Sequence, residues 1–280
     1  MKLRNILAYT LASAFIFSLC ACNIKGSMSS RDLTNTQELI VFAASSMTDT
    51  LIKLGDAYMA ENPNINIVFN FDSSGTLKTQ IQEGADVDVF ISAGQKQMNQ
   101  LDITVSKDVN TDGLDFILEG TRCNILENKV VLVVPYNNPA DVHSYEDMVT
   151  GLKNGSIILA MGNSDVPVGQ YTQKILAYYE LSENDLESTG SITYGSNVRE
   201  VTTQVSEATV DCGIVYQTDA FSAKLTIVDT ADEEMCDQVI YPAAVLNVSK
   251  NPEAAKDFLE FIISDVANNV FEEVGFTAVE

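Results

Sequence analysis

The chain has 280 residues, 46% of them hydrophobic, and a formal charge of −23 at pH 7. So acidic a chain repels both the phosphate backbone of a nucleic acid and an anionic lipid surface, which excludes nucleic acid as a partner. Beyond an N-terminal apolar run, no stretch of about 18 apolar residues occurs, so no later membrane span is expected. The remaining length exceeds one small core and suggests two lobes.

The N-terminus has the features of a lipoprotein signal peptide. Two basic residues precede an apolar run over residues 6–19, shorter than the roughly 20 residues that span a bilayer. The run ends in Leu-Cys-Ala-Cys, where a small residue before a cysteine resembles the lipobox of bacterial lipoproteins. We predict a signal peptide over 1–21, a lipid-bearing mature N-terminus at Cys22 and a flexible tether over 22–37. An ordinary signal peptide with incidental cysteines is the alternative.

Few side chains are available for metal or nucleophilic chemistry. Beyond Cys22, the cysteines are Cys123, Cys212 and Cys236, and their spacing is not that of metal ligands. His143 is the one histidine, and its polar surroundings predict a surface loop. We therefore expect no catalytic residues and no enzyme. Whether Cys123 and Cys236 form a disulfide stays open.

After the tether, short β-branched runs alternate with segments of helical period, which predicts an α/β fold with mainly parallel sheets covered by helices. In the first part, Asn62-Pro63 and Gly84 mark helix ends. The expected strands there are 39–43, 65–71 and 87–91. One expected helix begins at about residue 46, and a second covers 74–83. The long segment over 95–127 breaks the rhythm and is expected to wrap the surface.

The second part continues the alternation. The expected strands are 130–134, 157–160, 191–194, 212–215 and 225–228, and the expected helices are 145–152, 169–179 and 198–207. A strand over 239–246 then returns to the first lobe, covered by a helix over 253–263. The predicted lobe I is thus 38–126 with 237–280, and lobe II is 127–236. The chain thus passes between the lobes twice, and two such connecting segments make a hinge with a cleft between the lobes.

Four segments place small or hydroxyl residues where a predicted strand ends and a helix begins. In open α/β sheets ligands bind at this carboxyl end, and a helix N-terminus offers unpaired N–H groups that suit an oxyanion. Ser46 and Ser74 add hydroxyl donors, whereas Val168 and Val198 can donate only through the backbone. Ser46, Ser74 and Asn197 taken singly can also be helix caps.

In order along the chain, the motifs VFAASSM, SSGTL, DVPVGQY, NVRE and GIVYQTDA resemble those of the molybdate-binding protein family of bacterial molybdate importers. The similarity covers nearly all of residues 38–280. It implies a type II periplasmic-binding-protein fold and an extracytoplasmic monomer without cofactor, which the predicted lipid on Cys22 would anchor to the membrane. It also implies capture of molybdate or tungstate and delivery to the membrane permease of an ABC importer.

Carried over motif by motif, the resemblance also implies the site residues. The oxyanion would bind to hydroxyl and N–H groups of two serines, two backbone N–H groups of the second lobe and a tyrosine hydroxyl, which are Ser46, Ser74, Val168, Val198 and Tyr216. The metal would reach the site only as the oxyanion, with no direct metal-ion ligands.

The chain departs from the family pattern at three places. Gly75 stands where the family often has a third serine, Val168 stands where alanine is common, and the segment over 95–127 is longer than in shorter relatives. That segment is either a passive surface excursion or a contact with the importer.

Three alternatives stay open at this stage. A binder of sulfate or another tetrahedral oxyanion would share the architecture but need a smaller cavity. A two-lobed transferase would need a general base, a covalent cysteine or several arginines. A surface adhesin with a vestigial pocket would bind no small ligand tightly.

Overall fold

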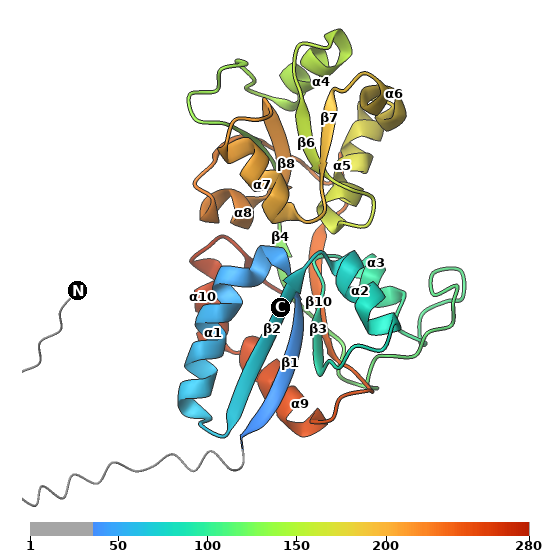
Figure 1. The fold of residues 1–280 in the computed structure, drawn as a ribbon, viewed down its shortest axis with the longest axis vertical. Coiled ribbons are helices and arrows are strands. Elements are labelled where there is room, and N and C mark those ends of the chain that lie inside the picture. The colour runs from blue at the N-terminus through green and yellow to red at the C-terminus, as the bar shows by residue number, and fades with distance from the viewer. Residues whose placement is uncertain (1–35, 280) are drawn as a thin grey trace, which may run out of the picture. The chain divides into compact units, whose positions relative to one another are not determined.

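The computed structural model describes residues 36–279. The predicted signal peptide, Cys22 and nearly all of the predicted tether lie outside this range. The described residues form two sheets flanked by helices, which confirms the α/β class and the two-lobed architecture (Figure 1).

The first lobe is built on a six-stranded sheet in the order β11-β4-β10-β3-β1-β2. Its strands are β1 (Gln37–Ala44), β2 (Ile65–Asp72), β3 (Val89–Ile91), β4 (Cys123–Asn128), β10 (Val239–Val245) and β11 (Thr277–Ala278). Strand β1 pairs in parallel with β2 and β3, whereas β10 is antiparallel to β3 and β4. The carboxyl ends of β1, β2 and β3 therefore meet at one edge of the sheet.

Helices cover both faces of this sheet because successive strand residues point to opposite sides. In β1, Val41 and Ala43 join the core on one face, while Phe42 packs with Leu77 and Phe90 on the other. On the first face lie η2 (Ser45–Met47), α1 (Thr48–Glu61), α9 (Pro252–Ile262) and α10 (Asp265–Glu272); on the second lie α2 (Ser74–Gln82) and α3 (Gln95–Asn99).

The second lobe has a five-stranded sheet in the order β7-β6-β8-β5-β9. Its strands are β5 (Val130–Val134), β6 (Leu159–Gly162), β7 (Ile192–Gly195), β8 (Cys212–Tyr216) and β9 (Thr226–Thr230). Its helices are α4 (Tyr145–Asn154), α5 (Pro167–Tyr178), α6 (Glu183–Ser188), α7 (Val198–Ser206) and α8 (Gln217–Ser222). Strand β6 is parallel to β7 and β8, so the N-termini of α5 and α7 follow the same sheet edge.

Two segments connect the lobes. The chain leaves the first lobe at Lys129, between β4 and β5, and returns between β9 and β10. Because β4 and β10 pair with each other, the two crossings lie side by side (Figure 1). The predicted boundary at 126/127 falls inside β4, and the one at 236/237 falls between β9 and β10.

The expectation for residues 95–127 is wrong in part, because this segment contains helix α3 and strand β4. Strand β4 buries only Ile125, Leu126 and the polar Asn128, so its sequence shows no clear alternation, and its pairing with β10 decides its conformation. The short helices α6, α8 and α10 and the strand β11 were also not expected.

The structure also bears on the expectations for the histidine and the cysteines. His143 is exposed on a loop, with its Nε2 2.8 Å from Asp141 Oδ1, which confirms the surface prediction. Cys123, Cys212 and Cys236 are free thiols, so Cys123 and Cys236 are not joined.

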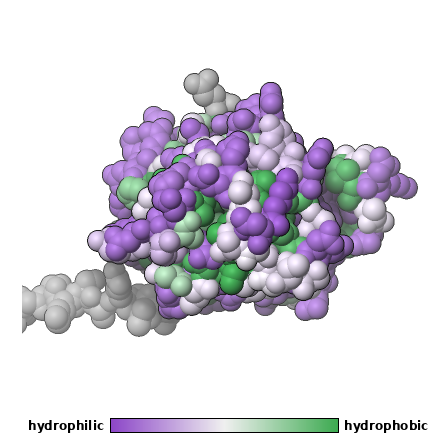
Figure 2. Space-filling model, turned by 90° about the horizontal axis from the view of Figure 1, so that it is seen from above, coloured by the Kyte–Doolittle hydropathy of each residue, from purple (hydrophilic) through white to green (hydrophobic). Residues whose placement is uncertain are grey.

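The face of the molecule on the side of the second lobe is largely hydrophilic (Figure 2). Figure 2, which views the molecule from the side of the second lobe, shows hydrophilic side chains over most of this face, with small hydrophobic spots between them. Among residues 36–279, no helix has both the length and the apolar character needed to cross a membrane.

Candidate functional site

A small cavity lies where β1, β2, β6, β7 and β8 end. It is lined by Ala44, Ser45, Ser46, Asp72, Ser73, Ser74, Ala93, Val166, Pro167, Val168, Val198 and Tyr216. The five residues predicted to bind the oxyanion are all among them. In this closed arrangement the cavity has a volume of about 10 Å³, which is about the space that a single water molecule needs.

Ser74 lines the cavity and has two groups that can donate, its backbone N–H and its hydroxyl. It is the first residue of α2, so its N–H has no acceptor within the helix. The cap of this helix is Ser73, whose Oγ accepts the Thr76 N–H at 3.1 Å, and the capping interpretation of Ser74 is therefore wrong. Ser74 Oγ instead accepts the Ala93 N–H at 2.9 Å, which leaves the serine proton free for another acceptor.

Ser46 makes a different contact. It lies in the 3-10 helix η2, and its Oγ is 2.9 Å from the hydroxyl of Tyr241 on β10. The side chain caps no helix in this structure, so the capping interpretation of Ser46 is also wrong.

The second lobe contributes two backbone N–H groups at helix N-termini. Val168 follows Pro167 at the start of α5, and Val198 is the first residue of α7. Both valine side chains are buried in the core, so the backbone N–H is what each can offer. Asn197 caps α7 by accepting the Glu200 N–H at 3.2 Å, as its sequence position suggested.

The N–H groups of Ser46, Ser74, Val168 and Val198 share one property. Each lies in the first turn of its helix, where no intrahelical acceptor exists. Within the described residues, no other acceptor is bonded to any of the four. Because unpaired buried donors are costly, the arrangement favours a ligand that supplies only acceptors.

Tyr216 ends β8 and reaches across to the first lobe. Its hydroxyl donates to the carbonyl oxygen of Ala93 at 3.3 Å, a long hydrogen bond. Burial raises the pKa of Tyr216 well above its usual value, so the phenol keeps its proton. With a single proton, Tyr216 can serve Ala93 or a ligand, and donation to a ligand requires the hydroxyl to turn.

The cavity has neutral hydrogen-bond donors and no cationic side chain in its lining. Its lining includes no Lys, Arg or His, and the one charged residue is Asp72, whose Oδ1 accepts the Ser73 N–H at 2.7 Å. The nearby Arg199 is engaged elsewhere, because its Nη2 lies 2.7 Å from Asp49 Oδ2 in an ion pair between the lobes. An anion at this site would be held by helix N-termini and hydroxyls.

Gly75 allows the lobes to come together beside the cavity. A Cβ built on this residue would lie 2.2 Å from the backbone oxygen of Asp165 in the second lobe. Only glycine fits such an approach, so the departure from the serine common in the family has a steric consequence.

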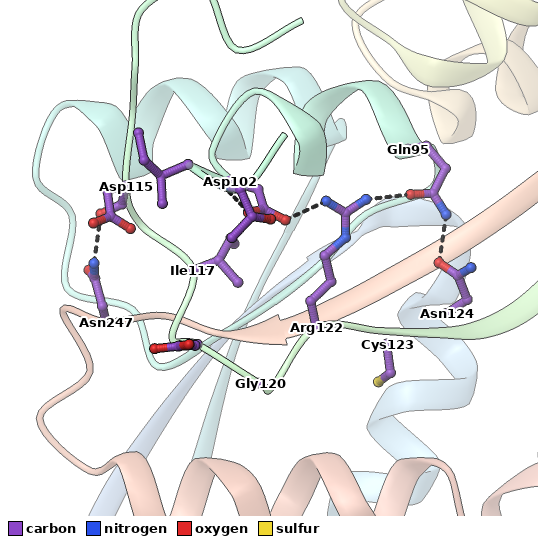
Figure 3. A pocket seen from close by; sticks show the side chains of 12 residues that line it. Gln95, Asp102, Asp115, Ile117, Gly120, Arg122, Cys123, Asn124 and Asn247 are labelled. Atoms are coloured by element: carbon purple, nitrogen blue, oxygen red, sulfur yellow. Dashed lines mark hydrogen bonds and ion pairs between the residues drawn. The ribbon is translucent and has the colours of Figure 1, made fainter. Parts of the chain in front are cut away.

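A larger cavity lies elsewhere, in the first lobe, and has a volume of about 780 Å³. Figure 3 shows that the guanidinium of Arg122 is bound by Asp102 at 2.6 Å and by Gln95 at 2.7 Å. Burial by itself raises the pKa of Asp102, but hydrogen bonds from Thr104 and Arg122 outweigh it and hold the pKa below its usual value. With its arginine neutralised, this cavity is poorly suited to an anion.

Sequence reasoning did not single out Ala93, which lines the small cavity, or Tyr241, which lies outside the lining but contacts Ser46. Ala93 follows β3, the third parallel strand of the first lobe, and its place at the same sheet edge was a signal that could have found it. Tyr241 lies within a strand, and no local signal in the sequence points to its contact with Ser46.

Comparison with known proteins identifies the family. Residues 39–277 match the model of the bacterial extracellular solute-binding proteins. The chain belongs to this family. It is therefore a binding protein of two α/β lobes, in agreement with the expectation that it is not an enzyme.

Two curated relatives and one solved structure are similar over most of the chain. A Bacillus subtilis protein named as an ABC transporter substrate-binding lipoprotein is 32% identical over 99% of both chains. The molybdate-binding protein ModA of Haemophilus influenzae is 32% identical over 86% of this chain and 90% of its own. The substrate-binding domain of a molybdenum ABC transporter from Clostridium difficile is 30% identical, with a TM-score of 0.61 over 87% of this chain and 99% of its own.

Proposed function

We propose that this solute-binding protein captures molybdate, and also tungstate, between its lobes and delivers it to the membrane permease of an ABC importer. One observation carries the proposal: four unpaired backbone N–H groups and the hydroxyls of Ser46, Ser74 and Tyr216 converge on a single small cavity from both lobes. The names of its molybdate-binding relatives support the choice of ligand.

The mechanism is capture by closure. The first lobe presents Ser46 and Ser74, while the second presents Val168, Val198 and Tyr216. An oxyanion that accepts hydrogen bonds from both sets binds the closed state more tightly than the open state, and so shifts the hinge toward closure. Several charge-assisted hydrogen bonds, each about 1.5–3 kcal/mol, can hold a dianion here without a cationic side chain.

The experiment is a thermal-shift screen with molybdate, tungstate, sulfate and phosphate, followed by calorimetry. A ligand that binds only the folded state raises the unfolding temperature with its concentration. We expect large shifts with molybdate and tungstate and small ones with sulfate. Equal stabilisation by sulfate would refute the assignment.

Hydrogen phosphate is a second candidate because of Asp72. This carboxylate lines the cavity and is an acceptor that the hydroxyl of a protonated anion could use. A strong response to phosphate that is lost in Asp72→Asn would favour this ligand, whereas a response to molybdate that survives the substitution supports the main proposal.

The membrane attachment forms part of the same proposal. We infer that Cys22 carries the lipid, that residues 22–37 are the tether and that the protein acts as a monomer outside the cytoplasm. The lipoprotein name of the Bacillus subtilis relative supports this. Metabolic labelling with a fatty acid should mark the wild-type protein and leave Cys22→Ser unlabelled, and light scattering should give the mass of one chain.

A further inference from the structure

A buried chain of hydrogen bonds runs from Ser46 to the crossings between the lobes. Ser46 Oγ lies 2.9 Å from Tyr241 Oη, which in turn lies 3.3 Å from Asn128 Nδ2. Asn128 Nδ2 also lies 2.9 Å from Thr218 Oγ1. Tyr241 is on β10 and Asn128 ends β4, so the chain passes through both strands next to the crossings.

The direction of donation along this chain follows from Asn128. Its Oδ1 accepts the Lys129 N–H at 2.8 Å, which fixes the orientation of the amide. The two N–H bonds of its Nδ2 are then directed at Thr218 and Tyr241. Since the Tyr241 oxygen accepts one of them, the Tyr241 proton is available for Ser46 Oγ.

This direction determines what Ser46 can do. When Tyr241 donates to Ser46 Oγ, the serine proton must go to another acceptor, and the lining of the cavity lies beside it. Tyr241 is fully buried, and burial raises its pKa well above the usual value, so the phenol remains a neutral donor. Ser46 thus becomes a hydroxyl that offers a proton to the cavity.

We propose that Tyr241 is a positioning residue that orients Ser46 as a donor and thereby favours fully deprotonated oxyanions. This inference rests on the proposed function and names a residue that sets the specificity of the same site. Without Tyr241, the Ser46 oxygen regains an acceptor position that the hydroxyl of a protonated anion could use.

The test is Tyr241→Phe, which keeps the ring packed between Tyr216 and Phe276 and removes only the hydroxyl. Tyr145→Phe is the matched control, because Tyr145 is also fully buried and its hydroxyl has no partner within the described residues. We expect Tyr241→Phe to weaken molybdate binding by about tenfold, the effect of one well-directed hydrogen bond, and Tyr145→Phe to leave it unchanged.

A double-mutant cycle separates positioning from a general structural effect. If Tyr241 acts through Ser46, then adding Tyr241→Phe to Ser46→Ala should cause little further loss of molybdate affinity. The ratio of phosphate to molybdate affinity, measured by calorimetry, should also rise in Tyr241→Phe alone. A purely structural role would instead reduce both affinities in proportion and add fully to Ser46→Ala.

The outcomes separate this inference from the proposed function. If the wild-type protein does not bind molybdate, the proposed function fails. If the wild-type protein binds molybdate but Tyr241→Phe behaves like the Tyr145→Phe control, or its loss adds fully to Ser46→Ala, only the role of Tyr241 is overturned.

Discussion

Replacement of Gly75 by alanine should separate closure of the lobes from folding. The new Cβ would lie 2.2 Å from the Asp165 oxygen, whereas ordinary contacts begin at 3.4 Å. The two backbones must therefore separate by about 1.2 Å, the difference between these distances. Because the clashing atom is a backbone oxygen, no side-chain rotation can relieve the contact.

This separation should weaken the hydrogen bonds that a ligand makes to the second lobe. Asp165 is three residues before Val168, so its retreat moves the Val168 N–H away from the first lobe. Stretching a bond of about 2.9 Å by this amount removes most of its strength. We expect the loss of one charge-assisted hydrogen bond, about 1.5–3 kcal/mol, which corresponds to a Kd roughly 10- to 150-fold higher.

Calorimetry with molybdate and thermal unfolding without ligand form the assay. Alanine favours a helix more than glycine does, so the free energy of unfolding without ligand should stay the same or rise. Thr79→Ala places alanine on the exposed side of the same helix; it removes a 3.1 Å hydrogen bond from Thr79 Oγ1 to the Gly75 carbonyl oxygen but adds no atom between the lobes, so it should leave affinity unchanged. Normal affinity in Gly75→Ala would refute the closed arrangement described above.

Three further predictions concern the donors and one buried acid. Ser46→Ala and Ser74→Ala should each weaken molybdate binding by about 1–3 kcal/mol with the fold retained, and calorimetry that finds both unchanged would exclude these hydroxyls as ligands. Val198→Pro removes the N–H at a helix position where proline is favoured, so it should lose molybdate affinity while Val198→Ala, which keeps the N–H, does not. Burial raises the pKa of Asp219 to about 8, opposed in part by Arg199. The folded state therefore holds this proton from about pH 4 to about pH 8 while the unfolded state releases it, so the free energy of unfolding should fall as the pH rises through this range. Denaturant titrations should show a flatter profile in Asp219→Asn; an identical profile would contradict the assignment.

Much of the fold could be predicted from the alternation of strand-like and helix-like segments along the chain. Strands such as β5 and β8 are uninterrupted apolar runs because both of their faces are buried, and such runs are visible without a structure. The helices α1 and α9 likewise show their inner faces as apolar residues at helical spacing. Strand β4 has no such signal, since a partner strand from more than 100 residues later holds it in place.

The candidate site also has features that local sequence predicts and features that it does not. Local sequence determined that Ser46, Ser74, Val168 and Val198 stand at the starts of helices, because strand ends and cap residues are signals within a few positions. The structure showed that Ser73 and not Ser74 is the cap, because the Ser74 hydroxyl is engaged by the N–H of Ala93, 19 residues further along the chain.

The contacts between distant segments belong entirely to the tertiary structure. Tyr241 lies 195 positions from Ser46 along the chain, yet their hydroxyls are 2.9 Å apart. The approach of Gly75 to Asp165 joins the two lobes in the same way. Such contacts depend on how two sheets close about a hinge, and no pattern within a single segment encodes that distance. The sequence by itself therefore pointed to the groups that we propose bind an oxyanion, and the packing of the lobes decided which of them lie together.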